Sequence, residues 1–427
     1  MATGHRTSTK KLSVGIIGGS IAGCTAAIEM DRLGFTCTLL ERSGDELKDR
    51  GAGIGVPPSV MRTFVERKLI DADTPYFEGH AFTRIWRTQS EQEYGYVAWD
   101  QPANLALLNW GALYRNLRDR VPNEVYRAGH QATAIRQLPN DTVAVELKDG
   151  KIEYFDLLIC ADGYTSLGRS TIFPESKLNY AGYVLWRGFL SENNIQDPRP
   201  MEKGIRCLGY PGGHGIFYFV PGPEGSVAPG TRLVNWGMYL PVPPSELAEF
   251  LTDKEGYAHS GSLPPGGMPL PLEQHLKSRA HDQVPDYYAA ILDKCENTFA
   301  YAIYDCYVPA YRKGRICLVG DAGAFARPHT AAGALKGIND SVALGQALES
   351  HNDIELALDD WSSTCTATNN GLVEFGSQLG QALVLQIPDW SRMGSAAMEK
   401  WFTSIVTMKT EVLDPNLRPR SEVKGNR

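Results

Sequence analysis

The stretch that decides the fold runs from Arg315 to Asp340 and reads RICLVGDAGAFARPHTAAGALKGIND. It opens with an apolar segment, 316–319, that has the length and composition of a buried strand. Asp321 follows that strand, and a loop leads into a helix of small residues that starts near Gly333. The first N–H groups of a helix lack intrahelical acceptors, and the helix dipole makes that end positive. We therefore expect this segment to bind an anionic or electron-rich part of a ligand.

A second glycine-marked turn lies near the N-terminus, where residues 12–23 read LSVGIIGGSIAG. A helix and a second strand follow, and Glu41 ends that strand at about the spacing of twenty residues that dinucleotide-binding folds show. In those folds the glycines form the turn and admit the pyrophosphate, and the acid binds ribose hydroxyls. Ser20 replaces the second glycine. An ordinary turn also contains glycines, but the strand–helix–strand–acid context favours a nucleotide site.

The bulk properties are those of a soluble enzyme with more than one lobe. The 427 residues exceed the usual size of a single core, and the hydrophobic and charged fractions, 43% and 21%, are ordinary. The net charge of −7 argues against nucleic acid as a partner. The eight cysteines show neither a CxxC pair nor zinc spacing, so we expect free thiols, no metal and a cytoplasmic location. No apolar run has the length of a membrane span.

The composition and residue pattern along the chain predict an α/β fold in four segments. Residues 11–179 form the first part of a Rossmann-like nucleotide-binding domain, and residues 305–365 form its second part. The intervening residues 180–304 are rich in aromatic residues, proline and glycine, with period-2 runs that predict a mainly antiparallel substrate-binding sheet. Residues 366–427 form a helical C-terminal segment, whose Met and Trp residues suit either helix packing or a homodimer seam.

A third motif, Asp162-Gly163-x-x-Ser166-x-x-Arg169, ends another apolar strand. Together with the N-terminal glycine turn and the segment that carries Asp321, it resembles the single-component FAD-dependent aromatic hydroxylases of the para-hydroxybenzoate hydroxylase type. The three motifs occur in the family's order, and the resemblance spans nearly the whole chain.

Three further runs bring the resemblance closer to one branch of that family. They are YAGYVLWRG at 180–188, RLVNWGMY at 232–239 and RPHTAAGALK at 327–336. These runs look like the 2,6-dihydroxypyridine 3-hydroxylase branch. The resemblance implies FAD as the cofactor and NADH or NADPH as the electron donor, and it does not fix the substrate.

The resemblance also implies cofactor-binding residues in the three motifs and in the loop after Glu41. They are Gly18, Ser20, Ile21, Ala22, Gly23, Glu41, Arg42, Arg50, Gly53, Asp162, Gly163, Asp321, Gly333, Ala334 and Leu335. By resemblance, the first motif faces the FAD pyrophosphate, Glu41 the adenosine ribose and Asp321 the ribityl chain. The N–H groups of Ala334 and Leu335 meet the flavin edge, where a helix N-terminus stabilises the anionic reduced flavin.

The implied reaction hydroxylates an activated ring through a C4a-hydroperoxyflavin, and a phenolic proton has to be removed in its course. His329, which follows Pro328 on the loop toward the flavin, and His214, which precedes an expected cavity strand, are the candidate catalytic residues. For each of them a plain turn histidine stays open. The candidate substrate-binding residues are Trp186, Arg187, Phe217, Tyr218 and Pro328. The sequence does not choose between Phe217 and Tyr218, because a shift of one residue exchanges the faces of a strand.

The sequence thus predicts an FAD- and NAD(P)H-dependent monooxygenase that acts on a phenolic or hydroxylated N-heteroaromatic ring, with or without loss of a ring carboxylate. A small aromatic substrate and O2 are the expected partners, and a homodimer is one arrangement that the tail allows. A flavin-dependent oxidase, epoxidase or halogenase on the same scaffold stays open, as does a non-catalytic FAD-binding redox protein.

Overall fold

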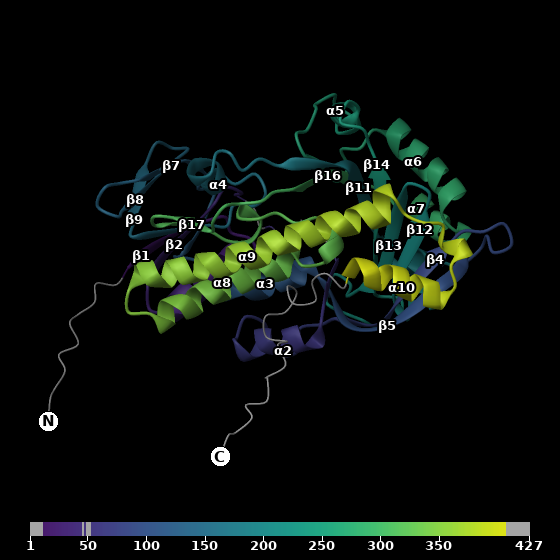
Figure 1. Cartoon of the computed structure of the whole chain (residues 1–427), viewed down its shortest axis with the longest axis horizontal. Helices are drawn as coiled ribbons and strands as arrows, with labels where there is room; N and C mark the ends of the chain where they lie inside the picture. Colours follow the sequence, from purple (N-terminus) through teal and green to yellow (C-terminus); the bar gives the residue numbers. More distant parts are fainter. Residues whose placement is uncertain (1–11, 45–46, 48–52, 407–427) are drawn as a thin grey trace, which may run out of the picture.

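The computed structural model describes residues 12–44, 47 and 53–406 of the chain. Two long helices, α8 (Gly333–Ser350) and α9 (Ile354–Gly380), run side by side along the long axis of the molecule (Figure 1). They connect the half of the molecule that carries a parallel sheet with the half that carries a larger antiparallel sheet. Arg50 lies outside the described residues.

The smaller half is built on a six-stranded sheet with the strand order β17-β18-β10-β1-β2-β6. Its strands are β1 (Ser13–Ile17), β2 (Thr36–Glu41), β6 (Tyr126–Ala128), β10 (Leu157–Cys160), β17 (Arg312–Lys313) and β18 (Ile316–Leu318). All neighbours are parallel except β17 and β18. In the register, Ile17 lies beside Leu40 and Cys160, and Cys160 lies beside Leu318. The three motifs, which follow these strand ends, therefore meet at one edge of the sheet.

Helix α1 (Ile21–Arg32) joins β1 to β2 and packs against α8. Ala22 lies at the contact, where a Cβ built on Gly337 would lie 2.9 Å from the Ala22 Cβ. Ser341 of α8 also donates a hydrogen bond to the Ala22 carbonyl at 3.0 Å. This close packing fixes the start of α1 relative to the start of α8, although the two are more than three hundred residues apart in sequence.

The larger half is a nine-stranded sheet with the order β15-β16-β11-β14-β13-β12-β4-β5-β3. Its strands are β3 (Gly53–Val56), β4 (Phe77–Trp86), β5 (Tyr96–Asn109), β11 (Asn179–Ser191), β12 (Gly204–Tyr210), β13 (Gly213–Val220), β14 (Leu233–Pro241), β15 (Ser262–Leu263) and β16 (Phe299–Asp305). Only β4 and β12 pair in parallel. The predicted α/β class with a mainly antiparallel second sheet is confirmed. Strands β3 to β5 join this sheet from the N-terminal part of the chain, so the chain crosses between the two halves more than once.

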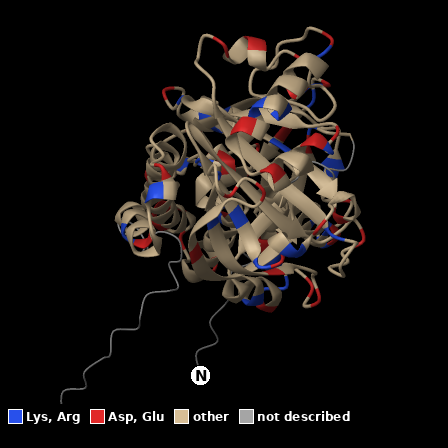
Figure 2. Ribbon diagram, turned by 90° about the vertical axis from the view of Figure 1, so that its right-hand side faces the viewer, with Lys and Arg blue, Asp and Glu red and all other residues tan. Residues whose placement is uncertain are grey.

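The remaining elements cover these sheets. They are α2 (Pro58–Glu66), α3 (Trp110–Asp119), α4 (Leu167–Ile172), α5 (Leu247–Phe250), α6 (Leu270–Gln283), α7 (Asp286–Asp293), α10 (Ser395–Val406) and a small sheet of β7 (Ala132–Gln137), β8 (Val143–Leu147) and β9 (Ile152–Phe155). Among the described helices, none is long and apolar enough to cross a bilayer. In the view of Figure 2, basic and acidic segments are mixed along the described chain.

The described part of the C-terminal segment is helical, as predicted, and it packs within the chain. Met398 is fully buried in a cluster with Trp86 and Trp390. The Trp401 ring lies 6.0 Å from the Trp390 ring. These tail residues therefore contribute to the packing of α10 against β4 and β5.

Candidate active site

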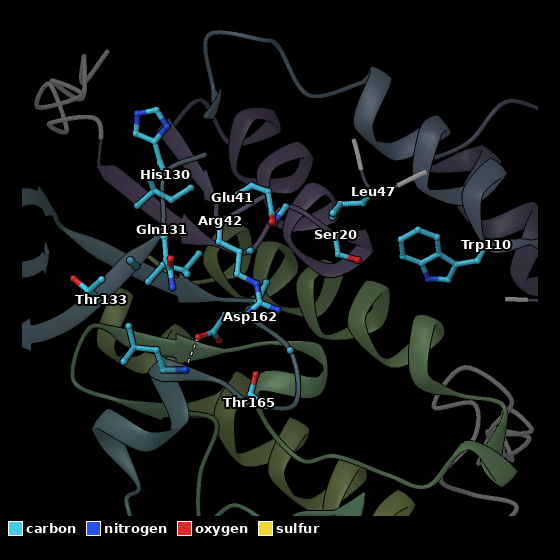
Figure 3. Close-up of a pocket in the computed structure, with 18 residues that line it drawn as sticks. Ser20, Glu41, Arg42, Leu47, Trp110, His130, Gln131, Thr133, Asp162 and Thr165 are labelled. Carbon is cyan, nitrogen blue, oxygen red and sulfur yellow. Dashed lines mark hydrogen bonds between the residues drawn. The ribbon is translucent and has the colours of Figure 1, made fainter. Parts of the chain in front are cut away.

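A cavity of about 550 Å³ lies at the edge of the parallel sheet where the motifs meet. Figure 3 shows the side chains of Ser20, Glu41 and Asp162 around it, with Trp110 at one end and His130 at the other. Residues of the first and third motifs thus line one space, although they come from distant parts of the chain. The cavity is large enough for a nucleotide.

The first motif has the backbone geometry that a bound diphosphate needs. Gly18 has a φ of +100°, and a Cβ built there would lie 2.3 Å from the Ala161 carbonyl oxygen. A Cβ on Gly23 would lie 1.8 Å from the Gly18 carbonyl oxygen. Helix α1 starts here, and the side chain of its N-cap residue, Ser20, accepts no N–H group of the helix. The first N–H groups of α1 are therefore available to an anion.

Glu41 holds this turn in place. Its carboxylate accepts hydrogen bonds from the backbone N–H of Gly19 at 2.7 Å and of Ser43 at 2.8 Å, and the side chain is buried. Glu41 and its neighbour Arg42 also line the cavity. The contact of Glu41 with a ribose stays a prediction.

Asp162 caps helix α4 while it lines the cavity. Its carboxylate accepts from Ser166 Oγ at 2.5 Å and from the backbone N–H groups of Leu167 at 2.6 Å and Gly168 at 3.2 Å. Burial raises the pKa of Asp162, and these hydrogen bonds oppose the rise. Gly163, with a φ of +76°, lines the cavity beside it.

Arg169 connects this motif to the loop that carries Asp321. Its guanidinium donates to the backbone carbonyls of Asp321 and Ala322, both at 3.1 Å. Asp321 does not line the cavity of about 550 Å³. Its carboxylate lies 3.5 Å from the buried ammonium of Lys336. Burial raises the pKa of Asp321, and the charge of Lys336 opposes this effect.

Helix α8 begins at Gly333, and its N-cap residue Ala332 provides no side-chain cap. The first N–H groups of the helix, including those of Ala334 and Leu335, therefore have no intrahelical acceptor.

Gly53, on β3, packs closely against Tyr218, since a Cβ built on Gly53 would lie 2.5 Å from that ring. The cofactor roles of these residues stay predictions.

The residues fit an FAD molecule in two places. The cavity with its glycine turn, uncapped helix N-terminus and acidic residues suits the adenosine diphosphate part. The N-terminus of α8 suits an electron-rich ring edge. Arg169 and the contact between α1 and α8 hold the two places in a fixed relation.

The structure brings the two candidate catalytic histidines together. His214 Nε2 lies 3.2 Å from His329 Nδ1, although the residues are 115 positions apart. His329 Nε2 lies 2.8 Å from Tyr183 Oη. The ring of Tyr239 stacks on His214 at 4.6 Å and packs at a tilt against His329 at 4.3 Å. Pro328 lies in the same 3₁₀ turn as His329 and is exposed.

Both histidines are neutral at physiological pH. Burial lowers the pKa of His214 to about 3. Burial also lowers the pKa of His329 well below its ordinary value, and His214 and Arg327 add to this effect. A neutral imidazole has one nitrogen that can accept a proton.

Strand register separates the other substrate-binding candidates. Phe217 pairs with Trp236, and Tyr218 pairs with Asn235, so the two candidates point to opposite faces of the nine-stranded sheet. The Phe217 ring lies 5.2 Å from the ring of Tyr288 on α7. Trp186 is on the same face as Phe217, with its ring 4.9 Å from that of Trp236. The structure therefore places Trp186 and Phe217 in the core under α7 and not beside the histidines.

Arg187 and Tyr218 lie on the face that carries His214. The Arg187 guanidinium donates to Asn235 Oδ1 at 2.7 Å and to Tyr301 Oη at 2.6 Å. The same Asn235 oxygen accepts from the Gly53 N–H at 3.1 Å. Burial raises the pKa of Tyr218 to about 12, and Arg187 opposes this rise.

Sequence reasoning missed residues at both places. The cavity is also lined by Trp110, His130, Gln131, Thr133 and Thr165. His130 and Gln131 follow β6, a parallel strand of only three residues that has no recognisable pattern. Tyr183 and Tyr239 could have been found from strand alternation, because they lie at even spacing from Arg187 and Asn235.

Comparison with known proteins agrees with this geometry. A family model described as FAD binding domain-like matches residues 180–305. The chain is 27% identical over 363 residues to the 2,6-dihydroxypyridine 3-monooxygenase of Paenarthrobacter nicotinovorans, covering 82% of this chain and 86% of that protein. It is 26% identical over 349 residues to the 3-amino-4-hydroxybenzoate 2-monooxygenase of Streptomyces platensis, covering 80% of each chain.

The fold is shared with a solved structure as well. The structure of 2,6-dihydroxypyridine-3-hydroxylase from Arthrobacter nicotinovorans has a TM-score of 0.81, at 23% identity, over 88% of this chain and 94% of that chain. The chain therefore has the fold of this hydroxylase, and the family model indicates an FAD-binding protein. The predicted resemblance, including that to the 2,6-dihydroxypyridine branch, is confirmed. The chain is thus similar to FAD-dependent aromatic monooxygenases in sequence and in fold.

Proposed function

We propose that the protein hydroxylates a phenolic or hydroxylated N-heteroaromatic ring, with NADH or NADPH as the electron donor. The observation that carries the proposal is the contact at 3.2 Å between the neutral imidazoles of His214 and His329. The similar proteins named above support the substrate class, since their names describe rings that carry hydroxyl groups.

FAD, when bound and reduced, supplies the electrons and the activation of O2. The protein surrounds the ring and accepts the proton of its hydroxyl group. Removal of the proton from a ring hydroxyl makes the neighbouring ring carbons electron-rich, and the histidine pair is placed to hold that proton. The rings of Tyr183 and Tyr239 pack against the pair, in which His214 is buried and His329 is half-buried.

Arg187 and Tyr218 form a second polar group on the face of the sheet that carries His214. Arg187 is buried, and the residues that accept its hydrogen bonds, Asn235 and Tyr301, are uncharged. We propose that this guanidinium and the Tyr218 hydroxyl orient the ring relative to the histidines. Loss of a ring carboxylate during the reaction would appear as CO2 and is decided by product analysis.

The experiment that tests the proposed function starts with the purified protein reconstituted with FAD. Hydroxylated pyridines and phenols are screened for NADH or NADPH oxidation that depends on the added ring. Matched rings without a hydroxyl group are the control. We expect stimulation only by rings with a hydroxyl group, and hydroxylated product in step with oxidation. Oxidation that yields only peroxide with every ring would instead favour an oxidase, and failure to bind FAD would contradict the cofactor.

A further inference from the structure

Arg327 determines the direction of the hydrogen bond between Tyr183 and His329. Arg327 Nη1 donates to Tyr183 Oη at 3.5 Å. The same oxygen lies 2.8 Å from His329 Nε2. A guanidinium has only donors, so Tyr183 Oη is the acceptor in the first bond. The hydroxyl proton of Tyr183 is then free to be donated to His329.

Arg327 and Tyr183 have little freedom to change this arrangement. Arg327 Nε donates to Asp305 Oδ2 at 2.8 Å, and Arg327 Nη2 lies 2.7 Å from the same oxygen. Tyr183 is fully buried, and a Cβ built on Gly380 would lie 2.2 Å from its hydroxyl oxygen. Among the described residues, His329 Nε2 is the acceptor within reach of the Tyr183 hydroxyl. A buried hydroxyl group is almost always hydrogen-bonded, so this proton belongs on the bond to His329.

We infer that Arg327 and Tyr183 hold His329 with its proton on Nδ1. His329 then donates a hydrogen bond to a ring hydroxyl placed between the two histidines, and His214 Nε2 accepts the proton of that hydroxyl. The inference rests on the proposed hydroxylation and identifies the base within it. The contact at 3.2 Å between the imidazoles is the longer of the two bonds that His329 makes, and it is the one that a ring hydroxyl replaces.

In the resulting step, the O–H bond of the ring hydroxyl breaks and an N–H bond forms at His214 Nε2. The electron pair of the broken bond stays on the ring oxygen, which accepts a hydrogen bond from His329 Nδ1–H. Tyr183 and Arg327 are positioning residues, because they act through His329. The charged groups that face the pair are Arg327 with its partner Asp305, and Arg84, which acts on His214.

The tautomer of His329 can be measured without turnover. The test is NMR of the full chain with isotope-labelled imidazole nitrogens, with His329→Gln used to assign the signal. We expect one neutral form with the proton on Nδ1 between about pH 5.5 and about pH 8.5. Tyr183→Phe should give a mixture of tautomers. Tyr180→Phe is the matched control on the same strand, since the Tyr180 hydroxyl donates to Val242 and not to the pair, and it should leave the signal unchanged.

The assignment of roles is tested with glutamine variants. A side-chain amide can donate a hydrogen bond but cannot take up a proton at neutral pH. His329→Gln should therefore retain hydroxylation of 2,6-dihydroxypyridine, or of the best ring from the screen, within about tenfold. His214→Gln should lower it by about a hundredfold or more.

Two results would overturn the inference. One is a wild-type His329 with its proton on Nε2 or on both nitrogens. This measurement is made on the wild type, so it does not depend on whether Tyr183→Phe folds. The other is the reverse order of the two glutamine variants. If the wild type hydroxylates no ring but His329 carries its proton on Nδ1, the proposed function fails while the tautomer assignment stands.

Discussion

Arg169 donates hydrogen bonds from its guanidinium to the backbone carbonyl of Asp321 at 3.1 Å, and this contact joins two motifs that are 152 positions apart. The same nitrogen reaches the carbonyl of Ala322. Because Asp162 and Asp321 follow neighbouring strands of the parallel sheet, Arg169 ties the edge of the cavity to the loop that carries Asp321. The arginine of the third motif is therefore a structural tie between two of the motifs that we expect to bind the cofactor.

Replacement of Arg169 by Met should weaken FAD binding. The change leaves several buried carbonyls without a donor, at a cost of about 1–3 kcal/mol each before relaxation. We expect the Kd for FAD to rise by at least about tenfold, measured by fluorescence titration of the apoprotein. Arg199→Met, at an exposed arginine paired with Asp197, is the control and should not change the Kd. An unchanged Kd in Arg169→Met would contradict the proposed tie.

Replacement of His329 by Ala should slow hydroxylation much more than flavin reduction. The histidine lies beside the ring hydroxyl in our account, and its loss is expected to cost about 10²–10³-fold in the oxygen-transfer rate. Flavin reduction by NADH or NADPH, followed anaerobically at the flavin absorbance, should change only a few-fold. His281→Ala, at an exposed histidine paired with Asp293, should leave both rates unchanged. Equal losses in the two half-reactions would count against the role of His329 as hydrogen-bond donor to the ring oxygen.

Phe217 and Tyr218 should respond in opposite ways to substitution. Phe217→Ala removes a ring from the core under α7 and should lower the free energy of unfolding by about 3–5 kcal/mol. Tyr218→Phe should have little effect on stability but should raise the KM for the ring substrate. Urea denaturation and steady-state kinetics measure the two effects. A stable Phe217→Ala variant with a raised KM would show that the assignment of strand faces is wrong.

Stability should fall as the pH is lowered below about 6.5. His214 has a pKa of about 3 in the folded protein, so the folded state binds fewer protons than the unfolded state between that value and about 6.5. In this window the unfolding free energy decreases by up to about 1.4 kcal/mol per pH unit for such a group. The double variant His214→Gln/His329→Gln should show a weaker dependence than the wild type in urea denaturation at about pH 7 and about pH 5. An identical dependence would show that the pair is not buried in its neutral form.

The sequence predicted those parts of the fold in which local pattern and ligand chemistry coincide. The glycine turn before α1, the aspartate that caps α4 and the loop that carries Asp321 each follow an apolar strand, and these strands lie side by side in the parallel sheet. The two catalytic candidates, His214 and His329, were proposed from separate loops and lie 3.2 Å apart.

The missed features depend on tertiary pairing. The register between β13 and β14 determines which face of the sheet Phe217 occupies. Amino-acid composition carries no information about that register. Strands β3 to β5 join the second sheet across a long stretch of sequence, which no local pattern shows. The role of Tyr183 is visible only from the positions of Arg327 and His329 around its hydroxyl.

We propose that this protein transfers one atom of O2 to a ring that carries a hydroxyl group. The most direct measurement is turnover of a ring from the screen under isotopically labelled O2, with the product analysed by mass spectrometry. We predict one labelled oxygen atom in the product and a product yield that follows the NADH or NADPH consumed. An unlabelled product, or peroxide as the sole product with every hydroxylated ring, would contradict the claim.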